Sequence, residues 1–184
     1  MKKNPLRKLP FKIALCAVIA ALSVVMLMLT SVIPFGTYAL PGLAGAFLVI
    51  VVVELNAKWA LGVFAVTSLM GFFLAGDKEA AVCYILLLGY YPILKNLIEQ
   101  KIMLRVVRIL LKLAAFNAAA VGTFYITTLL LAIPAEEYTL FGIYMPLAFL
   151  AAGNLVFLLY DLALTQSVVF YVRKIRGRIF SEFR

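Results

Sequence analysis

The sequence predicts an all-α integral membrane protein: one domain over residues 1–184, a bundle of six transmembrane helices with both termini in the cytoplasm. Composition is the first reason, because 66% of the residues are hydrophobic, 14% are charged and the mean hydropathy is +1.10. Soluble domains carry about 25% charged and about 45–50% apolar residues. The second reason is that the apolar residues gather in stretches long enough to cross a hydrocarbon core of about 30 Å.

The distribution of basic residues predicts the orientation. Cytoplasmic loops of membrane proteins carry an excess of Lys and Arg. With six spans and both ends inside, every basic residue except Lys78 is cytoplasmic, which is 16 of the 17. Five spans would place the basic lead or the basic tail outside. The formal charge of +9 therefore reflects orientation and contact with anionic lipid, and we expect no nucleic acid partner.

The first predicted span covers residues 13–34 and is uncharged after Lys12, behind a basic lead that we expect to be irregular over residues 1–11. Its Ala17 and Ala21 form a pair of small residues one helical turn apart, which lets another helix approach closely. A cleaved signal peptide is the alternative interpretation, with Ala39 ending a passable cleavage site. The apolar core is longer than the roughly 7–15 residues of such a peptide, which favours a retained span.

The next two predicted spans are residues 41–55 and 59–75. Gly42 and Gly45 should allow close packing of the second span, because small residues let helix backbones approach. Trp59 should anchor the third span at the membrane interface.

The last three predicted spans are residues 80–97, 114–133 and 141–172. Pro92 predicts a kink in the fourth span, since proline removes a backbone donor and clashes with the preceding turn. Basic residues recur from Lys95 to Lys112, and at the end of this stretch they alternate with apolar residues at helical spacing. This pattern predicts an amphipathic segment lying at or entering the cytoplasmic side of the membrane.

Motifs for catalysis are missing from the sequence. It contains no His, which removes the usual general base and the most common metal ligand. It also contains no phosphate-binding loop, no dinucleotide fingerprint and no zinc-protease motif, so we expect no enzyme, no cofactor and no metal site. Cys16 and Cys83 should lie on opposite sides of the membrane and act as packing residues.

Three polar residues fall inside predicted spans: Asn117, Asn154 and Asp161. An ionisable residue at such depth is a candidate for function. The alternative for Asp161 is a structural role, paired with Asn117, with Tyr160 or with a Lys or Arg on the cytoplasmic side, because polar contacts commonly hold membrane helices together.

Aromatic and charged residues gather at the predicted outer ends of the spans. One interpretation is a belt of aromatic residues at the lipid headgroups. The other is the lining of an outward-facing ligand pocket. The candidate substrate-binding residues on that second interpretation are Tyr38, Asp77, Lys78, Glu79, Tyr125, Glu137, Tyr144 and Asn154.

The layout resembles the substrate-binding S components of energy-coupling factor (ECF) vitamin transporters. The residues that carry the resemblance are the run KIALCAVIAALSVV, in which Ala17 and Ala21 match the AxxxA motif of the family's first helix. The resemblance implies that Ala14, Ala17 and Ala21 dock onto a transmembrane coupling subunit driven by two cytoplasmic ATPases. It also implies that a vitamin or its precursor binds near the outer face, between helices four to six and the first loop.

The function we expect is therefore that of a substrate-capturing subunit of an ATP-driven uptake transporter for a vitamin or another small metabolite, in the plasma membrane. The lack of a nucleotide site in this chain agrees with ATPases supplied by partners. The alternative is a non-transporting assembly or scaffold subunit that acts by helix packing. An intramembrane enzyme using Asp161 is the third and least favoured option, because general acid–base catalysis needs a second placed group.

Overall fold

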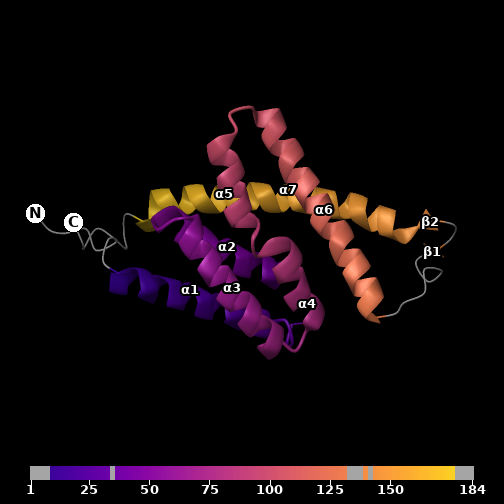
Figure 1. Cartoon of the computed structure of the whole chain (residues 1–184), viewed down its shortest axis with the longest axis horizontal. Helices are drawn as coiled ribbons and strands as arrows, with labels where there is room; N and C mark the ends of the chain where they lie inside the picture. Colours follow the sequence, from indigo (N-terminus) through magenta and orange to yellow (C-terminus); the bar gives the residue numbers. More distant parts are fainter. Residues whose placement is uncertain (1–8, 34–35, 132–138, 141–142, 177–184) are drawn as a thin grey trace, which may run out of the picture.

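The computed structural model is a bundle of apolar helices (Figure 1). The structure describes residues 9–33, 36–131, 139–140 and 143–176. Within these, five helical stretches are long and apolar enough to cross a membrane, and α2 is a shorter apolar helix. The helices are α1 (Leu9–Leu29), α2 (Ala39–Glu54), α3 (Ala57–Leu74), α4 (Lys78–Cys83), α5 (Tyr91–Lys101), α6 (Arg105–Leu131) and α7 (Met145–Phe170). Two short π-helical turns, η3 (Tyr84–Leu88) and η5 (Tyr171–Ile175), follow α4 and α7.

The helix α1 begins and ends four or five residues before the predicted first span. It begins at Leu9, inside the lead that the sequence predicts to be irregular, because proline is tolerated in the first turn of a helix and Pro10 lies there. It ends at Leu29, and the Thr30 hydroxyl donates a hydrogen bond of 2.7 Å to the carbonyl oxygen of Leu27 just beyond that end.

The kink predicted at Pro92 is confirmed. The helical path from α4 passes through η3 and bends at residues 89–90 before α5 begins at Tyr91. Proline occupies the first turn of α5, where a missing backbone donor costs no hydrogen bond.

The amphipathic segment predicted for residues 95–112 is divided between two helices, since α5 ends at Lys101 and α6 begins at Arg105. The basic residues from Arg105 to Lys112 form the first two turns of α6, which continues without a break to Leu131. No proline lies in this stretch to end the helix.

The sixth helix begins later than the predicted span of residues 141–172, because Ile143 and Tyr144 form the strand β2. This strand pairs antiparallel with β1 (Thr139–Leu140), and α7 begins directly after it with Pro146 in the first turn.

Small residues allow α2 to pack closely against α1, η3 and α7. A Cβ atom on Gly45 would lie 2.6 Å from the carbonyl oxygen of Leu88 and 2.8 Å from the hydroxyl of Tyr160. Only glycine therefore fits where α2 meets η3 and α7, which confirms the predicted close packing at this position. Ser23 of α1 is buried and donates a hydrogen bond of 3.1 Å to the carbonyl oxygen of Ala44 in α2.

Charged residues distinguish the two ends of the bundle. Lys12 of α1 lies 5.9 Å from the ring centroid of Trp59 at the start of α3. Arg176, directly after η5, forms an ion pair with Glu54 at the end of α2. We call this end, where α1 begins and η5 ends, the basic end (Figure 1). At the far end, Ser31 Oγ accepts a hydrogen bond of 2.9 Å from the backbone N–H of Gly76, which joins the ends of α1 and α3.

Candidate functional site

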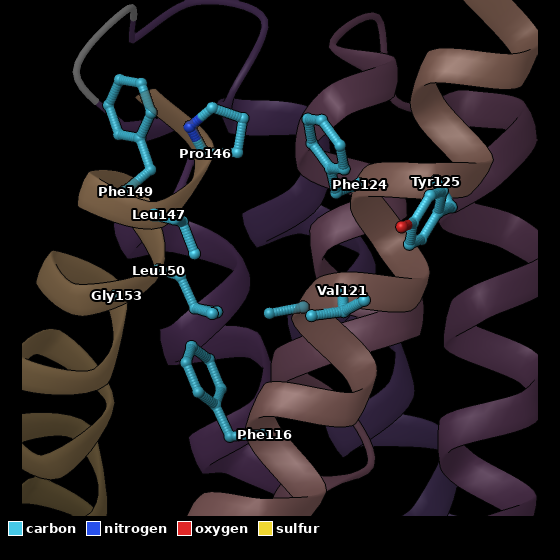
Figure 2. Close-up of a pocket in the computed structure, with 10 residues that line it drawn as sticks. Phe116, Val121, Phe124, Tyr125, Pro146, Leu147, Phe149, Leu150 and Gly153 are labelled. Atoms are coloured by element: carbon cyan, nitrogen blue, oxygen red, sulfur yellow. The ribbon is translucent and has the colours of Figure 1, made fainter. Parts of the chain in front are cut away.

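A cavity of about 390 Å³ lies between the second half of α6 and the first turns of α7, toward the far end (Figure 2). In Figure 2, side chains from both helices point into the gap that separates them. We call it the α6–α7 cavity. The lining residues are Phe116, Ala120, Val121, Phe124, Tyr125, Pro146, Leu147, Phe149, Leu150 and Gly153.

The floor of the cavity is an aromatic contact between the two helices. Phe116 of α6 stacks on Phe157 of α7 with ring centroids 4.4 Å apart and an angle of 16° between the planes. A Cβ atom on Gly153 would lie 3.5 Å from Cζ of Phe116, an ordinary van der Waals distance. A side chain larger than alanine at this position would therefore extend toward the cavity.

A reciprocal amide pair lies beside this floor. Asn117 Nδ2 donates a hydrogen bond of 2.8 Å to Asn154 Oδ1, and Asn154 Nδ2 donates one of 2.9 Å to Asn117 Oδ1. Each Nδ2 also donates to a carbonyl oxygen of its own helix, that of Leu113 or that of Leu150, at 2.8 Å. All four amide hydrogens are thus used, and the pair joins α6 to α7 without a charge.

Four charged side chains meet closer to the basic end, in what we call the charged cluster: Lys95, Glu99, Lys112 and Asp161. Lys112 of α6 lies 2.7 Å from Glu99 Oε1 and 3.0 Å from Asp161 Oδ1. Lys95 of α5 forms an ion pair with Asp161 and another of 3.1 Å with Glu99. Two positive and two negative groups therefore join α5, α6 and α7 into one network.

Burial in the charged cluster is uneven. Lys95 is 5% exposed and Lys112 is 6% exposed, whereas the side chain of Glu99 is 37% exposed. The hydroxyl of Tyr91 donates a hydrogen bond of 2.6 Å to Asp161 Oδ1, and Lys95 Nζ donates one of 2.8 Å to Thr165 Oγ1. Removing a charge from water is costly, so the buried ammonium groups of Lys95 and Lys112 depend on their ion pairs with Glu99 and Asp161.

The structure identifies the partners of Asp161. Its side chain pairs with Lys95 and Lys112, so the alternative of a basic partner is confirmed, while Asn117 pairs with Asn154. The hydroxyl of Tyr160 donates instead to carbonyl oxygens, that of Gly42 at 3.1 Å and that of Leu88 at 3.3 Å.

Sequence analysis missed most of the charged cluster. The sequence places Lys95 and Lys112 on the cytoplasmic side, at or entering the membrane, and it predicts no site role for Tyr91 or Glu99. The one available signal is the spacing of Lys95 and Glu99, since side chains four residues apart on a helix lie on the same face.

Four of the predicted substrate-binding residues, Tyr38, Asp77, Lys78 and Glu79, lie together at the far end. There they form hydrogen bonds with other residues of the chain. The hydroxyl of Tyr38 donates a hydrogen bond to Glu79, and Asp77 accepts one of 2.9 Å from the hydroxyl of Thr37. The bond to Glu79, together with partial burial, raises the pKa of Tyr38 to about 12.

Lys78 also has internal partners. Its ammonium donates hydrogen bonds of 2.8 Å and 2.9 Å to the carbonyl oxygens of Phe72 and Ala75 at the end of α3. These carbonyls lack partners inside the helix, so the contact caps α3. Binding a ligand through Lys78 would require its ammonium to leave both acceptors.

The remaining predicted residues are dispersed. Tyr125 lines the α6–α7 cavity, Asn154 belongs to the amide pair beside the cavity floor, and Tyr144 lies in β2. Glu137 lies outside the described residues.

The predicted docking residues lie together on the surface. Ala14, Ala17 and Ala21 are all exposed on α1, while Ile19 and Leu27 of the same helix are buried. The small-residue face therefore points away from α2 and α3.

Within the part of the chain that the structure describes, no group of three or more His, Cys, Asp or Glu side chains is arranged to hold a metal ion. Cys16 and Cys83 are free thiols. Comparison with known proteins found no matching family model, no matching curated protein and no matching solved structure.

Proposed function

We propose that this chain is the substrate-capturing membrane subunit of an ATP-driven uptake system of the ECF type. The observation that carries the proposal is the α6–α7 cavity, a hollow between the last two long helices and away from the basic end. Small-molecule sites are typically concave and mostly apolar, with volumes of about 300–1,000 Å³. The resemblance implies a substrate site near the outer face, between helices four to six and the first loop, and α6 and α7 correspond to the fifth and sixth predicted spans.

The orientation that we propose follows the basic residues. Lys and Arg are enriched on the cytoplasmic side of membrane proteins, so the basic end faces the cytoplasm and the cavity lies toward the outside of the plasma membrane. Both termini are then cytoplasmic. ATPases bound at the cytoplasmic side would act on the end of the bundle opposite the mouth of the cavity.

The surface of α1 supports the proposed partner. Ala17 and Ala21 are exposed one turn apart, with Ala14 one turn before them. A stripe of small residues lets a second helix approach closely, and membrane helices associate through such close packing. We propose that a transmembrane coupling subunit covers this stripe, and that this subunit connects the chain to the ATPases.

Co-purification of two alanine variants tests the proposal. Ala17→Trp places a large ring in the small-residue stripe, and Ala65→Trp places the same ring at an exposed alanine of α3. We expect the wild type and Ala65→Trp to co-purify from the native membrane with ATPase subunits, and Ala17→Trp to lose them. Equal recovery of ATPases with both variants would contradict docking through α1. Recovery of a different membrane complex without ATPases would favour the scaffold alternative.

A further inference from the structure

We propose that the ligand of the α6–α7 cavity is an uncharged, ring-containing apolar molecule that enters from the side facing the lipid. This inference rests on the proposed function, because it names the class of substrate that the same cavity would capture. It follows from the charges around the cavity, from its hydrogen-bonding groups and from its exposed rim.

The charges around the cavity exclude an anionic ligand. None of the lining residues that the structure describes is charged. Along the sequence, no Lys or Arg occurs between Lys112 and Arg173, a stretch that includes the whole cavity lining. Lys112 is already held by Glu99 and Asp161. A buried charge without a partner is very costly, so a carboxylate or phosphate in this cavity would have no compensation.

Hydrogen bonding at the cavity is equally restricted. Among the lining side chains, Tyr125 supplies the only polar atom, its hydroxyl oxygen. The neighbouring Asn117 and Asn154 use all their amide hydrogens on each other and on their own helices. A ligand with many polar groups would leave those groups unpaired in an apolar site, at about 1–3 kcal/mol for each. The cavity therefore suits a molecule with at most one or two neutral polar groups.

Aromatic side chains favour a ring. The lining includes four aromatic rings, those of Phe116, Phe124, Tyr125 and Phe149, and Figure 2 shows the ring of Phe116 in the gap between the two helices. Aromatic rings gain from offset-stacked or edge-to-face contact with another ring, beyond the area that they bury. A molecule with one or two fused rings would make such contacts with both walls.

The rim of the cavity is open to the surroundings of the bundle. Tyr125 is 67% exposed, Leu147 is 64% exposed and Phe149 is 72% exposed. In a bilayer, these side chains face lipid along the outer half of α6 and α7. An apolar molecule dissolved in the membrane can therefore reach the cavity without crossing a polar surface.

A matched pair of glycine variants isolates the cavity. Gly153→Leu extends a side chain from α7 into the cavity, next to Phe116. Gly122→Leu makes the same change on α6 at a position where an added Cβ meets nothing within 4 Å. Both changes remove a helical glycine, so their effects on helix propensity match. Melting temperatures of the purified variants verify that each one is folded.

Three naphthalene probes with one shared ring system test the ligand class by equilibrium dialysis against the protein in nanodiscs, with empty nanodiscs subtracted. They are neutral 2-naphthalenemethanol, anionic 2-naphthoate and cationic 2-naphthylmethylammonium. We expect the neutral probe to bind at least about tenfold more tightly than either ion, which corresponds to about 1.4 kcal/mol. We expect Gly153→Leu to abolish this binding and Gly122→Leu to retain it.

Other results would overturn the inference in distinguishable ways. Preferred binding of an ionic probe that Gly153→Leu abolishes would leave the capture cavity in place and refute the uncharged class. Probe binding that both variants retain would mean that the α6–α7 cavity is not the binding site. Finding only phospholipid in the purified protein, with no excess probe over empty nanodiscs, would mean that acyl chains fill the cavity, and would count against substrate capture as well.

Discussion

The helices α2 to α5 and the pair α6 and α7 are held together by different forces. In an apolar stretch of 18 residues within Lys78–Lys101, 44% of the residues are buried, whereas in a stretch of the same length within Arg105–Tyr125 the share is 6%. The first region packs through small residues such as Gly45, which bring backbones into contact. The second is joined by the amide pair and the charged cluster, with one aromatic stack beside them. Polar contacts at a few points can hold α6 and α7 together while the rest of the space between the two helices stays unfilled. The α6–α7 cavity lies in that unfilled space.

The largest expected effect comes from breaking the charged cluster. Among the described residues, Asp161→Leu leaves Lys95 and Lys112 with Glu99 as their one charged partner, and an uncompensated buried charge costs about 3–5 kcal/mol. Asp161→Asn should cost less, because its amide oxygen still accepts the hydrogen bond from Tyr91. We expect melting temperatures in detergent to fall in the order wild type, Asp161→Asn, Asp161→Leu.

A double variant sharpens this experiment. Asp161→Leu combined with Lys112→Leu removes one charge of each sign, so it should recover part of the stability that Asp161→Leu loses. Equal melting temperatures for the wild type and all three variants would show that the charged cluster does not hold α5, α6 and α7 together.

A smaller effect, with opposite signs in the two regions, is expected for glycine to alanine. Gly45→Ala forces a methyl group to within 2.6 Å of a backbone carbonyl oxygen, and such overpacking costs about 1–3 kcal/mol. Gly122→Ala meets no neighbour, so it should gain up to about 1 kcal/mol from helix propensity. Thermal melting of both variants checks this contrast, and a loss of similar size at both positions would contradict the difference in packing.

The smallest expected effect concerns the amide pair. Asn117→Leu leaves the amide of Asn154 without its partner in α6, at a cost of about 1 kcal/mol. Replacing both asparagines by Leu removes the unpaired group, so the double variant should melt closer to the wild type. A double variant that melts lower than the single variant would show that the hydrogen bonds between Asn117 and Asn154 themselves stabilise the packing of α6 on α7.

Hydropathy and local breakers predicted much of the fold. The apolar stretches, the kink at Pro92 and the close packing at Gly45 follow from local chemistry, and the structure has all three. The continuity of α6 was missed, because basic residues at helical spacing describe a surface helix and the first turns of a longer one equally well.

The site depends on contacts that the sequence does not encode locally. Lys112 and Asp161 are 49 residues apart, and the two asparagines of the amide pair are 37 residues apart. Their pairing follows from how α6 crosses α7, which residue spacing alone does not determine. The cavity is harder still to predict, because a hollow between two apolar helices leaves no mark in their composition.

Native mass spectrometry of gently purified protein tests the central claim, substrate capture in the α6–α7 cavity, most directly. We expect the wild type and Gly122→Leu to retain one small molecule with the same mass, and Gly153→Leu, equally folded, to lose it. Retention of the same mass by Gly153→Leu, or its absence from the wild type, would contradict capture in this cavity.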